Sequence, residues 1–448
     1  MIQLKLTHLA RPSADGNELV RSLLEITSQQ SESRIPTHFV LLLDTSGSME
    51  EKNKLENVKR CVEILLTILT NTDRISLITF SDTSEIILKR VPADSVHKET
   101  ILSKVNGIHA DGSTNLSASI ANLKTVIAED TMKTGVILLT DGHANRGIAD
   151  VPTLTGMFKT LKEQNPLLTT ACLAYGSDHN AELLKAISNE GSGTYSIVTN
   201  LEDAATAIGS VFGSFISCCA QNVDLHLPLG STVEGPITLI NNNVSNCIKI
   251  GDIYSGSNTM YVMNLPANLI REEKPLVTLY GTQIPSLEHM IVSCDKGEFS
   301  LERNKDVELT LLRYRCASLF RQLAKWNTLS SVERANLQEE IRRFEDATND
   351  DFFSGHSLIQ MLKSEAQSLQ TSITMLFERR VRHETLQTHL IQHESVMTSG
   401  RGYTQAIEEA DPENHEIRSA APTDMTSPFR NPIQRTVAHA MRTMSSRH

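Results

Sequence analysis

The sequence predicts an α/β protein with a doubly wound, mostly parallel sheet, an added β-sandwich and a C-terminal helical module. Short, wholly apolar segments at 39–43 and 135–140 alternate with segments of helical periodicity, which is typical of parallel strands covered by helices on both faces. Between residues 222 and 307 the hydrophobic period becomes two, as in the strands of a sandwich. From Leu309 onwards the period is again helical.

These changes of period divide the chain into five segments. Its 448 residues exceed the roughly 250–300 at which a single core stops growing, so several domains are expected. Beyond Gly400, proline, serine, threonine and asparagine dominate, which indicates disorder. We expect N-terminal strands at 1–36 that join the β-sandwich, the α/β domain at 37–220, the β-sandwich at 221–307, the helical module at 308–398 and a largely disordered tail at 399–448.

Within the α/β domain, apolar strands and helical stripes follow one another in order. A helix at 54–70 is indicated by apolar residues at helical spacing, among them Leu55 and Val58. The segments 74–80 and 85–91 are short and β-rich, and we expect them to pair. Further strands are expected at 135–140, 168–175 and 194–198, and further helices at 95–105, 116–129, 154–163, 181–189 and 201–218.

Outside this domain the sequence predicts short strands and then three helices. Strands at 2–9 and 18–28 are too few to bury a face by themselves, so they must pair elsewhere. Ser330 and Glu333 form a capping box that opens the second of the three helices. The remaining sandwich strands are expected at 223–227, 247–250, 260–264, 276–280 and 289–293.

Charge and cysteine content narrow the classes of function. The 42 basic and 53 acidic residues give a net charge of −11, which argues against binding to nucleic acid or to an anionic membrane. Seven cysteines without a C-x-x-C pair indicate neither a disulfide framework nor a zinc finger. The N-terminus alternates polar and apolar residues, unlike a signal peptide, and no apolar run reaches the roughly 18 residues of a membrane span. We therefore expect a soluble, cytoplasmic protein without a transmembrane segment.

Five oxygen-bearing side chains lie in loops at strand ends or helix starts of the α/β domain. They are Asp44, Ser46 and Ser48 after the first apolar strand, Thr114 before a helix, and Asp141 after the second apolar strand. Open parallel sheets bind ligands at the carboxyl ends of their strands, where these loops meet. Mg²⁺ prefers about six oxygen ligands and retains several waters. The set therefore predicts a site for Mg²⁺, or Mn²⁺ in its place, that leaves a position for a carboxylate from outside.

In these residues the sequence resembles the von Willebrand factor A family and its metal-ion-dependent adhesion site. That site has the pattern D-x-S-x-S, then T, then D, and all three elements are present. The resemblance implies a Rossmann-like domain in which Ser46 and Ser48 bind the ion directly. It implies that Thr114 and Asp141 exchange direct and water-mediated roles as a ligand binds. Asp44 would act mainly through hydrogen bonds and water.

The resemblance covers roughly residues 36–220. In this family the last helix of the domain, here expected at 201–218, can shift along its axis when the site engages a ligand, and a static buttress is the alternative. Softer similarity in the segments 175–179, 191–195 and 250–256 points to intracellular eukaryotic proteins in which a β-region and helices follow the domain. Some of these carry a RING finger, which the scattered cysteines here do not form, so ubiquitin-ligase activity is not implied.

The predicted function is metal-dependent binding of a partner protein by a chain that is not an enzyme. Mg²⁺ would bridge to an aspartate or glutamate of the partner. A Mg²⁺-dependent hydrolase or phosphatase is one alternative. Haloacid-dehalogenase-like phosphatases, however, have the motif D-x-D, and the residue at the second aspartate position here is Ser46. The sequence also has no phosphate-binding loop. A second alternative is a scaffold protein with a vestigial metal site. Such a protein would still bind its partner in the presence of EDTA.

Two weaker signals are interpreted structurally. His383, His389 and His393 lie close together, but no carboxylate or cysteine completes a zinc site, so we expect a solvated helix face. The basic segment after Asp424 has apolar residues at helical spacing. Disorder is expected there, with a partner-docking helix or a contact to anionic lipid as the alternatives.

Overall fold

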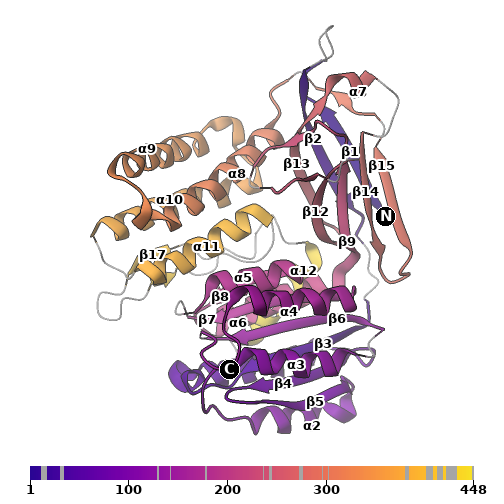
Figure 1. The fold of residues 1–448 in the computed structure, drawn as a ribbon, viewed down its shortest axis with the longest axis vertical. Helices are drawn as coiled ribbons and strands as arrows, with labels where there is room; N and C mark the ends of the chain where they lie inside the picture. The colour runs from indigo at the N-terminus through magenta and orange to yellow at the C-terminus, as the bar shows by residue number, and fades with distance from the viewer. Residues whose placement is uncertain are drawn as a thin grey trace.

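The protein has three parts, which Figure 1 shows as a parallel sheet with its helices at one end, and two further sheets beside a group of long helices at the other. The computed structural model describes residues 1–11, 18–30, 35–128, 131–141, 143–176, 179–235, 237–241, 245–271, 276–294, 296–300, 302–378, 383–399, 407–410, 417–419 and 431–445. Within these ranges, no helix combines the length and hydropathy that a membrane span requires.

The α/β domain is the doubly wound, mostly parallel sheet that the sequence predicts. Its strands are β3 (Thr37–Asp44), β4 (Arg74–Phe80), β5 (Ser84–Pro92), β6 (Lys133–Thr140), β7 (Leu168–Tyr175) and β8 (Ser192–Val198). Its helices are α1 (Lys54–Ile68), α2 (Ser95–Asn106), α3 (Leu116–Ile127), α4 (Val151–Gln164), α5 (Ala181–Glu190) and α6 (Leu201–Ser217). The strand order is β5-β4-β3-β6-β7-β8, and only the edge strand β5 runs antiparallel to its neighbour.

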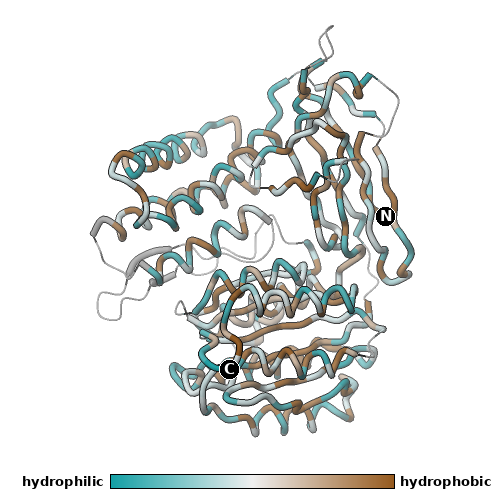
Figure 2. Tube along the Cα trace, in the orientation of Figure 1, coloured by the Kyte–Doolittle hydropathy of each residue, from teal (hydrophilic) through white to brown (hydrophobic). Residues whose placement is uncertain are grey.

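Strand β3 explains why this sheet needs helices on both faces. Phe39 and Leu41 pack into the hydrophobic cluster that includes α1 and α6, whereas Val40 and Leu42 pack into the opposite cluster with α3 and α4. A strand that is buried on both faces is apolar at every position instead of at every second one. Figure 2 shows this sheet as predominantly hydrophobic along its strands.

Two five-stranded sheets form the second part. One contains β1 (Ile2–His8), β2 (Leu19–Ser28), β10 (Thr232–Val233), β13 (Asn258–Pro266) and β16 (Glu298–Phe299). The other contains β9 (Cys218–Leu227), β11 (Ile240–Asn241), β12 (Asn246–Tyr254), β14 (Val277–Gln283) and β15 (His289–Cys294). Leu24 and Ile26 of the first sheet share one hydrophobic cluster with Val223 and Leu225 of the second, as in a sandwich. Because β2 pairs with β13, the α/β domain is inserted between these strands in the sequence.

Four long helices form the third part, where the sequence indicated three. They are α8 (Lys305–Ala324), α9 (Ser331–Thr348), α10 (Ser357–Glu378) and α11 (His383–Ser399). The capping box of Ser330 and Glu333 at the start of α9 is confirmed, with the backbone N–H of Ser330 donating to Glu333 Oε2 at 2.7 Å. The additional helix α11 packs between α8 and the α5 and β8 elements of the α/β domain.

The expectation of a solvated histidine face on α11 is wrong for two of its three residues. His389 and His393 are buried because α11 lies against α8 and the α/β domain. His393 Nδ1 is hydrogen-bonded to Glu365, and its ring stacks on Phe320. The side chain of His383 lies outside the described ones.

Helix α12 (Pro432–Ser445) differs from the expected disorder in the tail. Short strands β17 (Ile407–Ala410) and β18 (Ile417–Ser419) pair upstream of it, and most of the remaining tail lies outside the described residues. Val437 and Met441 of α12 are buried in the cluster that includes α1 and α6. The apolar face of the tail is therefore covered by the α/β domain. A shift of α6 along its axis would have to move α12 as well.

The contact between α6 and α12 depends on two glycines of α6. A Cβ atom built on Gly213 would lie 2.7 Å from the Cα of Gln434, and one built on Gly209 would lie 2.8 Å from the Cα of Ala438. Such distances to backbone atoms require the two helices to separate. Helix α12 can therefore approach α6 this closely only because α6 has glycine at these two positions.

Gly213→Ala is expected to displace α12, whereas Gly156→Ala is the matched control. Gly156 lies in α4 with no atom within 4 Å of its added Cβ, so alanine there stabilises the helix by up to about 1 kcal/mol. Hydrogen exchange of residues 432–445 should accelerate in Gly213→Ala and remain slow in Gly156→Ala. Unchanged protection in both variants would show that the glycine contact does not hold α12 in place.

Candidate metal centre

The carboxyl ends of β3 and β6 bring the predicted site residues to one edge of the sheet. Asp44 ends β3, Ser46 and Ser48 lie at the start of the 3₁₀ turn Gly47–Asn53, and Asp141 directly follows β6. Asp44, Ser46 and Asp141 are buried, whereas Ser48 is exposed. The cluster therefore reaches solvent at Ser48.

The oxygen atoms of three of these residues lie at the spacing of ligands around one small cation. Ser46 Oγ and Ser48 Oγ are 3.2 Å apart, and Ser48 Oγ donates a hydrogen bond to Asp141 Oδ1 at 2.8 Å. With Mg–O bonds of roughly 2.0–2.1 Å, neighbouring oxygens of an octahedron are about 2.9 Å apart. The donor set and its spacing thus fit Mg²⁺.

Asp44 is held rigidly behind the serine hydroxyls. Its Oδ1 accepts a hydrogen bond from the backbone N–H of Ser46 at 2.9 Å, and its Oδ2 accepts one from Thr140 Oγ1 at 2.6 Å. Burial raises the pKa of Asp44 to about 6, the hydrogen bonds from Thr140 and Ser46 oppose this, and the charge of Asp141 adds to it. A nearby divalent cation would favour the ionised carboxylate.

The loop that carries Thr114 is fixed against the serine turn by backbone and side-chain hydrogen bonds. The Gly47 N–H donates to the Gly112 carbonyl at 3.0 Å. The Thr114 N–H donates to Asn145 Oδ1 at 2.8 Å, and the Ser113 N–H donates to Asp82 Oδ1 at 3.0 Å. Thr114 is thereby placed beside the turn of Ser46 and Ser48.

Thr140, Asp82 and Asn145 support the site but were not among the predicted residues. Asp82 follows the end of β4, so a further carboxylate at a strand end was a signal available in the sequence. Gly112 has a φ of +79°, and a Cβ there would lie 3.1 Å from the Asp82 carboxyl carbon. Glycine is thus required where this carboxylate holds the loop.

Lys54 is a further functional residue that the sequence interpretation missed. Its Nζ donates to Asp141 Oδ2 and lies 3.3 Å from the Ser48 carbonyl oxygen. The side chain of Asp141 is fully buried and that of Lys54 is mostly buried. The ammonium group therefore supplies positive charge to the same carboxylate that a metal ion would use.

Comparison with known families identifies the α/β part of the chain. The sequence model described as von Willebrand factor type A domain matches residues 39–210. The chain is 28% identical over 210 residues to the uncharacterized protein YfbK of Escherichia coli strain K12, which covers 45% of this chain. The chain spans only 36% of the length of that relative.

Solved structures show that the fold outside the parallel sheet also has counterparts. The von Willebrand factor type A protein from Catenulispora acidiphila aligns with a TM-score of 0.59 at 14% identity, over 99% of this chain and 96% of that one. The ArnB paralog VWA2 from Sulfolobus acidocaldarius aligns with a TM-score of 0.53 at 16% identity, over 90% of this chain and 99% of that one. At such identities the likeness concerns the fold alone.

Proposed function

Because residues 39–210 form a von Willebrand factor type A domain, we propose that this protein binds a partner protein through Mg²⁺ that bridges to an aspartate or glutamate of the partner. The observation that carries the proposal is the cluster of Ser46 Oγ, Ser48 Oγ and Asp141 Oδ1 at an edge of the sheet that is open to solvent at Ser48. Domains of this family often mediate interactions between proteins.

Each of the five site residues has a role in this proposal. Ser46 and Ser48 would hold the ion through neutral hydroxyls, Thr114 and Asp141 would exchange direct and water-mediated roles, and Asp44 would orient the site through its hydrogen bonds. Mg²⁺ supplies a hard positive charge, and neutral hydroxyl ligands leave much of that charge uncompensated. An anionic carboxylate from a partner is then the favoured additional ligand. Mn²⁺ is expected to replace Mg²⁺.

A non-catalytic role is favoured over a phosphatase by the surroundings of Asp44. A nucleophilic aspartate must present a free oxygen to its substrate. Asp44 is fully buried, and both of its carboxylate oxygens accept hydrogen bonds. Mg²⁺-dependent turnover of a phosphate ester that is lost in Asp44→Ala would support the enzyme instead.

The proposal is tested by affinity capture with the full chain as bait. Captured proteins should bind in Mg²⁺, be released by EDTA and fail to bind the Ser48→Ala variant, whose exposed side chain can be truncated with little effect on folding. Substitution of a single aspartate or glutamate of the captured partner by its amide should also abolish binding. A partner that binds equally in EDTA and to Ser48→Ala would favour the scaffold with a vestigial site.

The stabilisation of the fold by Mg²⁺ is expected to depend on pH through Asp44. Since burial raises the folded-state pKa of Asp44 from 3.8 to about 6, the folded chain without metal retains a proton there that the unfolded chain has released. The contribution of Asp44 to the free energy of unfolding therefore decreases as pH rises from about 4 to about 6. Mg²⁺ requires the carboxylate, so its stabilising effect increases over the same window.

This dependence can be measured as the rise in melting temperature caused by Mg²⁺ at pH 5 and at pH 7.5. The rise should be larger at pH 7.5 for the wild type. In Asp44→Asn, which removes the titrating group, any remaining rise should be equal at the two pH values. A wild-type rise that is the same at both would contradict the role assigned to Asp44.

The cytoplasm is the compartment that we propose for this protein. The proposal rests on the seven cysteines, which show no disulfide spacing and form no disulfide in the described part of the chain. Localisation of a tagged full-length chain by fluorescence microscopy tests it. A signal confined to a secretory compartment would contradict it.

A further inference from the structure

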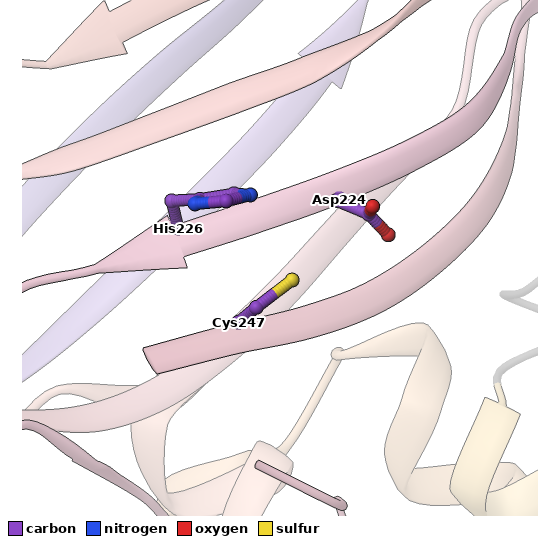
Figure 3. Close-up of side chains that lie close together, drawn as sticks. All are labelled: Asp224, His226 and Cys247. Atoms are coloured by element: carbon purple, nitrogen blue, oxygen red, sulfur yellow. The ribbon is translucent and has the colours of Figure 1, made fainter. Parts of the chain in front are cut away.

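A second group of metal-ligand side chains lies on the sheet of β9 and β12, outside the α/β domain. Asp224 and His226 are two residues apart on β9 and therefore lie on the same face of the sheet. Cys247 on β12 is the direct cross-strand partner of His226. The ligand atoms of the three side chains all lie within 4.8 Å of one another. Figure 3 shows the Cys247 sulfur pointing between the His226 ring and the Asp224 carboxylate.

We propose that Asp224, His226 and Cys247 bind a transition-metal ion of the Zn²⁺ class, with a fourth position left for water or an outside ligand. One thiolate, one imidazole and one carboxylate are the ligand types that Zn²⁺ uses in proteins. Three protein ligands with an open position are typical of zinc sites that exchange their fourth ligand.

The ligand types make this site chemically distinct from the one in the α/β domain. Mg²⁺ prefers oxygen ligands, and a thiolate is a poor ligand for it, whereas sulfur and imidazole favour Zn²⁺ and related ions. The serines and aspartates of the site in the α/β domain offer only oxygen ligands, which suit Mg²⁺. Mg²⁺ is therefore expected not to occupy the cluster of Asp224, His226 and Cys247, and a thiolate signal reports an ion bound there.

The spacing of the three side chains allows one ion to contact them all after small rotations. With Zn–N bonds of roughly 2.0–2.1 Å and Zn–S bonds of about 2.3 Å, tetrahedral ligand atoms lie about 3.3–3.8 Å apart. Since the ligand atoms here lie within 4.8 Å of one another, no pair is more than about 1.5 Å farther apart than in a bound site. Strands β9 and β12 need not move, because side-chain torsions supply such a change.

The hydrogen bond of His226 is arranged as it is in metal-bound histidines. His226 Nδ1 is 3.0 Å from Ser245 Oγ, so this nitrogen can donate to the hydroxyl and leave the Nε2 lone pair for the ion. Ligating histidines in proteins usually donate their other N–H to such a partner, which fixes the ring. The ring of Tyr280 on the adjacent strand β14 meets that of His226 edge-on, with centroids 4.7 Å apart.

The surroundings of the cluster partly shield it from water, because the side chain of Cys247 is buried and Asp224 and His226 are half-buried. Lys249 is the cross-strand partner of Asp224, so an ordinary ion pair is the alternative for that residue. Such a pair does not involve Cys247 or His226, which face each other across the two strands.

Cobalt titration of the full-length, reduced and tag-free protein tests the proposal. Co²⁺ is the probe because a thiolate ligand gives an intense sulfur-to-cobalt charge-transfer absorption. We expect one equivalent of Co²⁺ to produce this band and Zn²⁺ to remove it. The band should disappear in Cys247→Ser, and Co²⁺ affinity should fall by roughly tenfold or more in His226→Gln. Cys294→Ser on β15 and Asp141→Ala in the α/β domain are the controls, and both should retain the band.

The outcomes separate this site from other thiols and from folding defects. Absence of the band in the wild type, its retention in Cys247→Ser or its loss in Cys294→Ser would overturn the proposal. If a variant does not fold, the proposal can still be tested on the wild-type protein. Zn²⁺ should slow alkylation of Cys247 in the wild type without slowing that of Cys294, as read by peptide mass spectrometry, and equal rates with and without Zn²⁺ would also overturn it.

Discussion

In the Asp141→Ala variant, Mg²⁺ is expected no longer to raise the melting temperature, and the affinity for Mn²⁺ is expected to fall by at least about 100-fold. A hundredfold loss corresponds to about 2.7 kcal/mol, which is modest for removal of a buried anionic ligand. Asp141 Oδ1 lies 2.8 Å from Ser48 Oγ, so this carboxylate is in direct contact with a hydroxyl that would hold the ion. Calorimetric titration with Mn²⁺ measures the loss.

The control for this variant is Asp94→Ala, which removes a carboxylate with a purely structural role. Asp94 caps α2 by accepting a hydrogen bond from the His97 N–H at 3.0 Å. Its loss should cost about 1 kcal/mol of stability and leave Mn²⁺ affinity unchanged. If Asp141→Ala bound Mn²⁺ as tightly as Asp94→Ala, Asp141 would not be a ligand.

Lys54→Met is expected to have opposite effects with and without Mg²⁺. Without the ion, the buried Asp141 loses the ammonium group that pairs with it, and breaking such a pair costs about 3 kcal/mol or more of stability. With saturating Mg²⁺ the cation takes over that role, so much of the loss is recovered. Because Lys54 no longer competes for Asp141, Mg²⁺ affinity should rise by roughly tenfold.

Denaturant unfolding with and without Mg²⁺, combined with Mg²⁺ titration, measures both effects. Lys52→Met is the matched control, because it removes the same charge two residues away and its side chain is exposed. Equal gains in Mg²⁺ affinity in the two variants would indicate a general effect of net charge. No gain in Lys54→Met would show that Lys54 and the ion do not share Asp141.

The sequence was sufficient to predict the parallel sheet and the edge of the sheet at which the site lies. A strand such as β3, apolar at every position, has a single interpretation when helical segments flank it, and the carboxyl end of each parallel strand lies at a common edge. Asp44 and Asp141 therefore meet for reasons of topology. Binding of Mg²⁺ to them remains a prediction.

Two features were not predictable from the sequence: the conformation of the turn before α1, and the packing of the tail helix α12 against α6. Lys52 and Asn53 adopt φ values of +51° and +58°, and this left-handed bend begins α1 with Lys54 beside Asp141. No hydrophobic periodicity encodes such a bend. Similarly, the apolar spacing in the tail was visible, but its docking requires the absence of side chains at Gly209 and Gly213 on α6.

The burial of His389 and His393 was not predictable from the sequence for a similar reason. The spacing of His389 and His393 places both on one face of a helix, but it does not say what covers that face. In the structure, Phe320 of α8 stacks on His393, and Glu365 of α10 is hydrogen-bonded to it. Polar residues that are buried by satisfying one another have the same sequence pattern as a solvated face.

The most direct test of a metal centre at the edge of the parallel sheet is a crystal of this protein grown with Mn²⁺ and measured near the manganese absorption edge. An anomalous difference peak is expected within bonding distance of both Ser46 Oγ and Ser48 Oγ and next to Asp141. A map without a peak at these hydroxyls, in crystals that contain Mn²⁺ in excess, would contradict the metal site on which the proposed function depends.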